Sequence, residues 1–353
     1  MSESIDWSAA ARVGVSLVRP GPKLSPRDRA AAVARLRDAA PAAIELVAAA
    51  SGLPGSEQDI TGVTLVVDRP GIVRANVNVM RTVTAEIAEV SPTLAGRLAG
   101  RATGIGAGMM LAMVSSNILG QYEPFSSRLL LSAPSVEAVR AQIGANPTDF
   151  ALWVCLHEQT HRHQFAAAPW LREYMLGLMR RVITEAEQPA DDDDLGRPPA
   201  NPNLGLLGTL SSPAASEVLG EVTALMSLLE GYADLLMDVA GQPAIPSLPS
   251  IRAAVDARRQ PARWSPKAWL GRLLGLAAKV DQYVNGKAFC QAVRQQVGFV
   301  GLNVAFSSQE SLPTIDELNN PSAWVARVTE MSDERRRRIL NLVGGVRAPE
   351  TSL

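Results

Sequence analysis

The sequence predicts a mainly α-helical protein with a small β element. Apolar residues recur at helical spacing over most of the chain, in segments that open with capping residues and close before glycine or proline. Only two short runs, residues 62–67 and 128–132, have the composition of strands. With 353 residues and 47% hydrophobic side chains, the chain can bury a core without disulfides or a structural metal.

The helices are predicted from their caps and their periodicity. Ser25-Pro26 followed by Asp28 is a helix start, because the hydroxyl can accept hydrogen bonds from free amides and proline suits the first turn. We expect this helix to break at Pro41 and form a short helical hairpin. The other predicted helices cover residues 136–143, 148–168, 171–186, 213–240 and 269–296.

Two short strands are predicted. Residues 62–67 are β-branched and apolar, and they end at the turn signal of residues 68–71. Residues 128–132 carry three consecutive leucines and stop before Pro134. We expect this second strand to border a cleft whose floor is the helix over residues 148–168.

Composition suggests three regions, which are an N-terminal helical region (residues 1–60), a main domain (61–330) and a C-terminal tail (331–353). Within the main domain, residues 187–212 are rich in proline, glycine, asparagine and aspartate, which predicts an exposed loop. In the tail, the arginine run 335–338 stands beside two acids, which is typical of a solvated helix face.

The charge balance argues against polyanionic partners. The chain has 34 basic and 35 acidic residues, a net charge of -1, so we expect neither nucleic acid nor a membrane as a partner. The longest uncharged stretch, residues 102–122, is diluted by glycines and polar residues and predicts a buried helix. Cys155 and Cys290 stand far apart in apolar surroundings, and no export signal is readable, which favours a cytoplasmic protein.

The strongest motif lies in one helix. All three histidines of the chain fall between His157 and His163, and His157, Glu158 and His161 form the pattern H-E-x-x-H. On a helix the imidazoles of His157 and His161 point within about 40° of each other, with Glu158 beside them. Two imidazoles on one face with an adjacent base are typical of a zinc hydrolase.

The surrounding residues favour a metal site over a chance match. Residues 146–149 are a helix start, Pro169 is a stop, and the apolar residues 153–156 carry the histidines into the core. Imidazoles and a carboxylate buried without partners would each cost a few kcal/mol. His163 is rotated about 120° from His157, so we expect it to cap or to meet solvent.

A catalytic zinc takes three protein ligands and leaves one position open. Because the chain has no further histidine for the third position, that ligand must be a carboxylate or a cysteine. Glu230 is the best candidate, because it lies at the edge of the apolar seam of a long helix that Gly241 closes. Glu217 and Glu221 are alternatives. One turn beyond Glu230, Asp234 is placed to accept a hydrogen bond from the free ring nitrogen of a ligating histidine.

These residues resemble the gluzincin branch of the zincin metallopeptidases, where a glutamate is the third zinc ligand and an aspartate one turn later supports a histidine. More closely, the chain resembles the zincin-like metallopeptidases of type 2, which are also labelled as associated with coenzyme biosynthesis. The segments that carry the resemblance are residues 67–71, 74–76, 119–122, 157–165, 229–238 and 312–324. The resemblance implies a zincin-like catalytic domain over residues 61–330, a zinc ion and hydrolysis, but names no substrate.

One departure and one look-alike accompany the resemblance. The family is expected to carry a histidine where this chain has Tyr232, which lies two residues from Glu230 and faces the far side of the helix. The glycines of residues 103–108 have the wrong spacing for a dinucleotide loop and predict close helix packing instead.

The sequence therefore predicts a zinc metallopeptidase or amidase. Zinc held by His157, His161 and Glu230 would polarise the scissile carbonyl and acidify its bound water, and Glu158 would be the general base. The alternative is a non-catalytic zinc protein of the same fold that serves as a binding or assembly factor. The presence of Glu158 argues against it, because a structural site needs no base.

Overall fold

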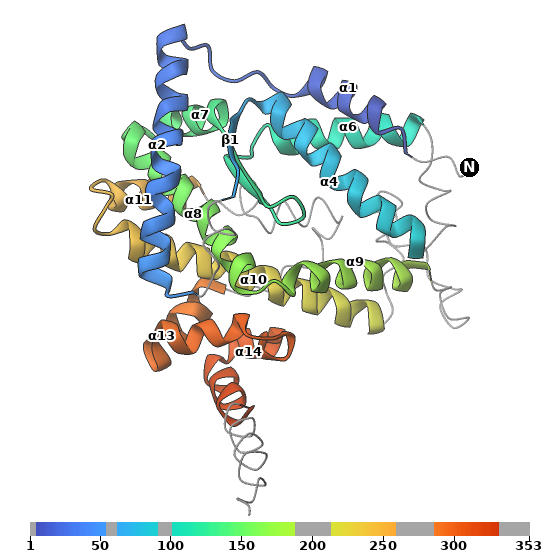
Figure 1. The fold of residues 1–353 in the computed structure, drawn as a ribbon, viewed down its shortest axis with the longest axis vertical. Coiled ribbons are helices and arrows are strands. Elements are labelled where there is room, and N and C mark those ends of the chain that lie inside the picture. The colour runs from blue at the N-terminus through green and yellow to red at the C-terminus, as the bar shows by residue number, and fades with distance from the viewer. Residues whose placement is uncertain (1–4, 54–61, 91–100, 188–212, 259–285, 332–353) are drawn as a thin grey trace, which may run out of the picture.

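The computed structural model describes residues 5–53, 62–90, 101–187, 213–258 and 286–331. They form a mainly helical molecule with one small sheet, as predicted (Figure 1). Nearly all of the predicted exposed loop (188–212) and the tail (332–353), and part of the predicted helix 269–296, lie outside the described residues. No helix within the described ranges combines the length and the apolar character needed to cross a membrane.

The elements follow one another along the chain in this order: α1 (Trp7–Leu17), α2 (Pro26–Ser51), β1 (Thr64–Val67), α4 (Arg69–Val90), α6 (Arg101–Ser115), β2 (Gly120–Glu123), β3 (Arg128–Ser132), α7 (Ala133–Ile143), α8 (Pro147–Ala167), α9 (Leu171–Glu187), α10 (Pro213–Gly241), α11 (Leu248–Arg258), α13 (Gly286–Leu302), the 3-10 turns Asn303–Phe306 and Gln309–Ser311, and α14 (Ile315–Asn319).

The sheet has the strand order β1-β3-β2, with β1 parallel and β2 antiparallel to β3. Both predicted strands are confirmed, but the sequence did not predict β2. The prediction of one helix over residues 102–122 was wrong at its C-terminal end, because α6 stops at Ser115. There the side chains of Ser116 and Asn117 donate to the carbonyls of Ala112 and Met113, which satisfies main-chain acceptors at the helix end.

Helix α2 does not break at Pro41, contrary to the prediction. A proline inside a helix removes one main-chain hydrogen bond, so a neighbouring element must stabilise the helix. Helix α8 provides that support, since Ala40 and Ala43 are buried between the two helices and the Gln159 amide donates to the Ala40 carbonyl at 3.1 Å.

Two apolar clusters hold the described residues together. The larger one, the main core, joins α2, α8, α10 and α13 and includes Phe150, Leu156 and Leu229. A smaller one, the second layer, lies between α1, α4 and α6, which run together at the upper right of Figure 1. In the second layer a Cβ on Gly108 would lie 2.5 Å from the Ala10 carbonyl oxygen, which confirms close packing at that glycine.

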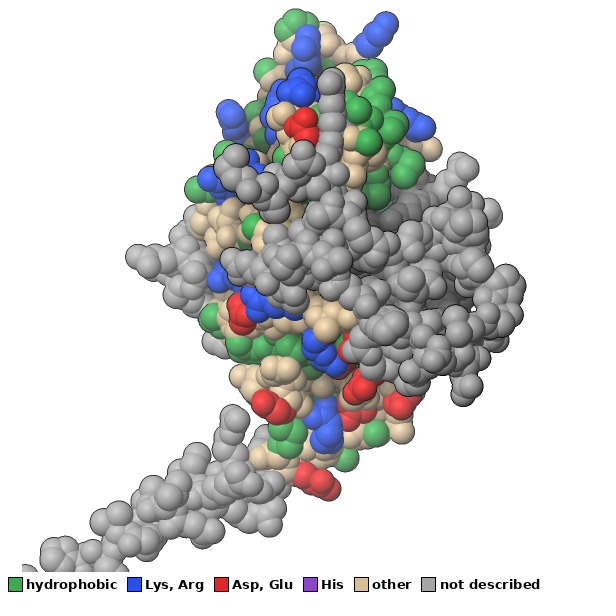
Figure 2. Space-filling view, turned by 90° about the vertical axis from the view of Figure 1, so that its right-hand side faces the viewer, with side chains coloured by type: hydrophobic (Ala, Val, Ile, Leu, Met, Phe, Trp, Pro, Cys, Tyr) green, Lys and Arg blue, Asp and Glu red, His purple; other side chains and the backbone are tan. Residues whose placement is uncertain are grey.

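The second layer leaves apolar side chains in solvent. Leu17, Met109 and Met113 are 55%, 50% and 57% exposed. Figure 2 looks onto the right-hand side of Figure 1, and its upper part shows hydrophobic side chains mixed with lysine and arginine. Met109 and Met113 lie one turn apart on α6, and a few exposed apolar side chains are normal for a protein surface.

Candidate metal centre

The site is built on α8. Asn146 caps this helix by accepting hydrogen bonds from the amides of Thr148 and Asp149, and Pro147 occupies its first turn. The helix ends at Ala167, just before Pro169. The predicted helix over residues 148–168 is therefore confirmed, and it presents His157, Glu158 and His161 from one rigid element.

Buried polar side chains tie α8 to its neighbours. Gln159 donates to the Ala40 carbonyl of α2, Arg162 to the Val63 carbonyl before β1, and Gln164 to the Leu229 carbonyl of α10. All three side chains are buried, so each hydrogen bond replaces water that the site excludes. Helix α8 is thus fixed in position against three separate segments.

Three of the predicted site residues meet between α8 and α10. His161 Nε2 lies 3.2 Å from His157 Nε2. The Glu230 carboxylate lies 3.5 Å from His157 Nε2 through Oε2 and 3.5 Å from His161 Nε2 through Oε1. Among the described residues this trio is the group of potential ligands whose donor atoms all lie within 4.8 Å of one another.

The geometry of the trio fits a zinc ion. Two ligand atoms, each about 2.0–2.1 Å from zinc at a tetrahedral angle, stand about 3.4 Å apart. The separations of 3.2, 3.5 and 3.5 Å are close to that value. Two imidazoles and one carboxylate are also a donor set that catalytic zinc sites use, with a fourth position left open.

The outward nitrogens of the two imidazoles have different neighbours. His161 Nδ1 lies 2.9 Å from Gln164 Oε1, and His157 Nδ1 lies 3.3 Å from the sulfur of Met237. Because Gln164 also donates to the carbonyl of Leu229, it links His161 to the backbone beside Glu230. The sequence reasoning missed Gln164, although it lies three residues beyond His161 and therefore near it on the same helix.

Asp234 lies in a cluster of charges. Its carboxylate pairs with Arg252 and lies 3.5 Å from Lys287 Nζ, and Asp238 contacts both of these cations at 2.5 and 2.7 Å. The guanidinium of Arg252 also lies 5.7 Å from the centre of the Trp153 ring on α8. Asp234 was predicted to accept a hydrogen bond from a ligating histidine, but at His161 the neighbour of the outward nitrogen is Gln164. A role of Asp234 towards His157 stays a prediction.

Glu158 is buried beside the trio, with 6% of its surface exposed. Burial, and next the nearby Glu230 carboxylate, raise the pKa of Glu158 to about 8, while a hydrogen bond from the Tyr122 backbone acts in the opposite direction. A carboxyl group whose pKa lies near neutrality is suited to taking up and releasing a proton.

Strand β2, rather than the predicted strand 128–132, runs beside Glu158. The strand β3 (residues 128–132) is the central strand of the sheet, and β2 is an outer one. A Cβ on Gly120 would lie 2.5 Å from Glu158 Cγ, so the close approach of strand and carboxylate requires glycine. The four-residue β2 contains a glycine and lacks any β-branched residue, and this explains why its sequence did not indicate a strand.

The remaining candidates lie elsewhere. Glu221 accepts from Tyr174 and Arg181 of α9, and Glu217 is exposed, so neither joins the trio. Tyr232 faces away as predicted and donates to Asn303 at 2.8 Å. His163 is buried, contrary to the expectation of a cap or solvent contact, and its Nδ1 lies 2.8 Å from the Gln159 carbonyl.

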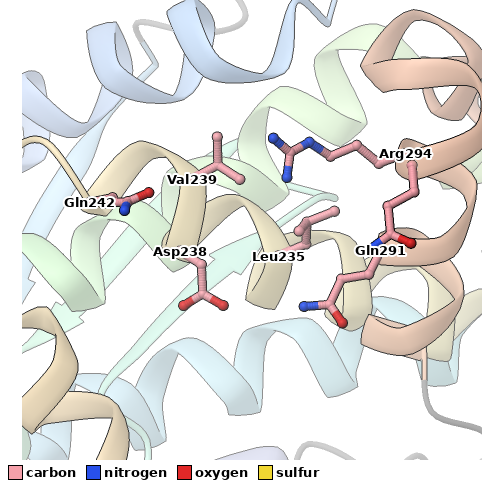
Figure 3. Close-up of a pocket in the computed structure, with 7 residues that line it drawn as sticks. Leu235, Asp238, Val239, Gln242, Gln291 and Arg294 are labelled. Carbon is pink, nitrogen blue, oxygen red and sulfur yellow. The ribbon is translucent and has the colours of Figure 1, made fainter.

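A separate cavity of about 330 Å³ lies between α10 and α13. Leu235, Asp238 and Val239 of α10 face Gln291 and Arg294 of α13 across it (Figure 3). None of its lining residues belongs to the trio, so this cavity is distinct from the candidate metal centre.

Fold and site together define a class of protein, namely helical proteins in which an H-E-x-x-H helix faces a second helix that brings a carboxylate to the two imidazoles. The chain belongs to the zincin-like metallopeptidase family, because the sequence model of that family matches residues 5–325. This agrees with the resemblance inferred from the motifs.

One solved structure is similar over nearly the whole chain. It is described as "a putative hydrolase with a novel fold" from Chloroflexus aurantiacus, with 26% sequence identity and a TM-score of 0.69. The match covers 92% of this chain and 99% of that one. No curated protein matches the chain. Family and structural neighbour together support a hydrolase of the metallopeptidase kind.

Proposed function

We propose that the protein is a zinc-dependent hydrolase that cleaves an amide bond, as a metallopeptidase or an amidase. The observation that carries the proposal is the meeting of His157, His161 and Glu230 at ligand distances beside the buried carboxylate of Glu158. A purely structural zinc site has no need of such a base.

The residues of the site would have different roles in hydrolysis. His157, His161 and Glu230 would hold the zinc ion, and Gln164 would keep the His161 ring in its orientation by accepting from Nδ1. The ion would supply Lewis acidity for the scissile carbonyl and acidify a water molecule. Glu158 would take the proton of that water and deliver it to the leaving amine.

The direction of the main-chain groups on the outer edge of β2 is a further argument for a peptide or amide substrate. The Leu129 amide donates to the Val63 carbonyl, towards β1, so Leu129 and its partner Tyr122 form a non-hydrogen-bonded pair of the antiparallel ladder. The main-chain groups of Gly120 and Tyr122 therefore point to the outer edge, where the Tyr122 amide donates to Glu158. A substrate strand would use the Tyr122 carbonyl and the main-chain groups of Gly120. An extended chain can add to such an edge by main-chain hydrogen bonds.

Metal analysis and one variant test the proposal. Protein purified without a histidine tag should contain about one zinc per chain, and it should cleave members of a broad peptide library. Glu158→Gln should keep the zinc and lose the cleavage. Zinc-free protein after growth in zinc would contradict the metal site. Zinc without any cleavage by the wild type would favour the non-catalytic alternative.

A further inference from the structure

We propose that Glu123 selects a lysine or arginine side chain of an extended peptide substrate that lies along the outer edge of β2. This inference rests on the proposed function and adds a substrate class to it. It is carried by a buried, incompletely bonded carboxylate on the strand that borders the candidate metal centre.

Glu123 is 5% exposed, and its two carboxylate oxygens differ. Oε2 accepts a hydrogen bond from the Ser126 hydroxyl at 2.7 Å, whereas Oε1 is buried and has no hydrogen-bond partner among the residues that the structure describes. On the same strand, Oε1 of Gln121 is likewise buried and has no partner in that part of the chain. Buried acceptors are normally satisfied, so two orphaned oxygens on one short strand indicate a donor that binds there.

The two oxygens belong to one face of the sheet. Gly120 and Tyr122 face α8, since Gly120 abuts Glu158 and the Tyr122 ring packs on Phe165 at 5.6 Å. Side chains alternate along a strand, so Gln121 and Glu123 share the opposite face. A substrate strand paired with β2 would place every second side chain on that face, about 4.5–5.5 Å from its cross-strand neighbour.

The charge of Glu123 is not balanced by an ion pair to any residue of the described ranges. Its cross-strand partner Arg128 is exposed, and Arg172 donates instead to the Pro124 carbonyl, to the Ser127 hydroxyl and, more distantly, to the Tyr122 hydroxyl. A buried carboxylate is costly without a cation. An ammonium or guanidinium group supplies both the charge and several donors.

The position of Glu123 on β2 determines how far the selected side chain stands from the scissile bond. Its Cα lies three residues along β2 from Gly120, which is about 10 Å at the rise of a strand. The basic side chain should therefore stand two or three residues from the scissile bond. A long, flexible lysine or arginine can bridge the remaining gap from either position.

Peptide hydroxamates provide the test, because they bind zinc and need no turnover. We would measure binding to the zinc-loaded protein by calorimetry for acetylated tripeptides with the hydroxamate at the C-terminal end, and for amidated tripeptides with it at the N-terminal end. Each position in turn carries lysine or its uncharged counterpart norleucine. At one position lysine should bind at least about tenfold more tightly than norleucine in the wild type.

Glu123→Gln should reduce that preference to within about twofold and leave the affinity of the norleucine peptides unchanged. Glu45→Gln, which alters an exposed acid on α2, is the matched control and should keep the preference. Equal binding of lysine and norleucine peptides at every position in the wild type would overturn the role of Glu123 without touching the zinc site, and this arm needs no variant. A preference that survives in Glu123→Gln would overturn it as well. Failure of every hydroxamate to bind would instead contradict the proposed function.

Discussion

The main core and the second layer both rest on packed helices, but they are held together by different contacts. In the main core, side-chain amides and a guanidinium reach across from α8 to carbonyls of three other segments. In the second layer, α1 and α6 meet through glycines such as Gly108, with backbone nearly against backbone. The first kind of contact specifies direction and register, while the second specifies only closeness.

This difference explains why the candidate metal centre lies where it does. Ligand atoms must stay within a few tenths of an ångström of their positions, which requires rotamers and helices that are fixed from several sides. Helix α8 meets that requirement through its polar anchors, and α10 meets it through the apolar seam around Leu229. The second layer contributes no residue to the trio. Changes in the main core should therefore affect the metal, whereas changes in the second layer should affect stability alone.

The largest effect is expected from the ligands. His157→Ala, His161→Ala or Glu230→Ala should each remove one of three donors, and zinc should fall from about one per chain to near zero after dialysis against a mild chelator. Metal analysis of the purified variants measures this. Glu221→Ala is a fitting control, because its carboxylate binds Tyr174 and Arg181 instead. Retention of zinc by Glu230→Ala would show that the third ligand is a different residue.

The second largest effect is expected from the proposed general base, Glu158. Glu158→Gln preserves the size of the side chain but cannot accept the water proton, so the rate of hydrolysis should fall by about 10² to 10⁴. Zinc content should stay near that of the wild type. The comparison of kcat for both proteins on the same peptide measures the loss, and an unchanged rate would remove Glu158 from the mechanism.

The supporting residues should have smaller effects. Gln164→Ala frees the His161 ring, and Asp234→Ala disturbs the charge cluster with Arg252 and removes the support predicted for His157. Losses of roughly 10- to 100-fold in zinc affinity are typical of such neighbours. Competition with a fluorescent chelator measures the affinities. A loss for Asp234→Ala that equals the loss for Glu230→Ala would mean that Asp234 is itself a ligand.

Sequence reasoning was successful where the signal is local. The spacing of His157 and His161 and the position of Glu230 in an apolar seam follow from helical periodicity, and both helices formed as predicted. It failed where distant contacts decide the local structure. Strand β2 exists because it pairs with β3, and α2 passes through Pro41 because it packs on α8. Gln164 could have been noticed from its spacing, whereas the Arg252 cluster joins three helices that no sequence pattern connects.

The smallest effects come from single methyl groups, and they test the contrast most directly. A Cβ on Gly231, next to Glu230, would overlap the backbone of Gly286, so Gly231→Ala must push α10 and α13 apart. Overpacking of this kind lowers the free energy of unfolding by about 1–3 kcal/mol. The higher helix propensity of alanine offsets up to about 1 kcal/mol of that loss. Gly108→Ala meets the Ala10 carbonyl oxygen at 2.5 Å and should cost a similar amount. Gly106→Ala has open space around it and should be neutral or slightly stabilising. Urea unfolding of the zinc-free proteins measures these three values.

Zinc affinity should distinguish Gly231→Ala from Gly108→Ala even though both lose a similar amount of stability. A shift of α10 moves Glu230 away from the imidazoles, whereas α1 and α6 hold none of the proposed ligands. A decrease in zinc affinity in Gly108→Ala equal to that in Gly231→Ala would mean that the two clusters are coupled and that the contrast between them is wrong.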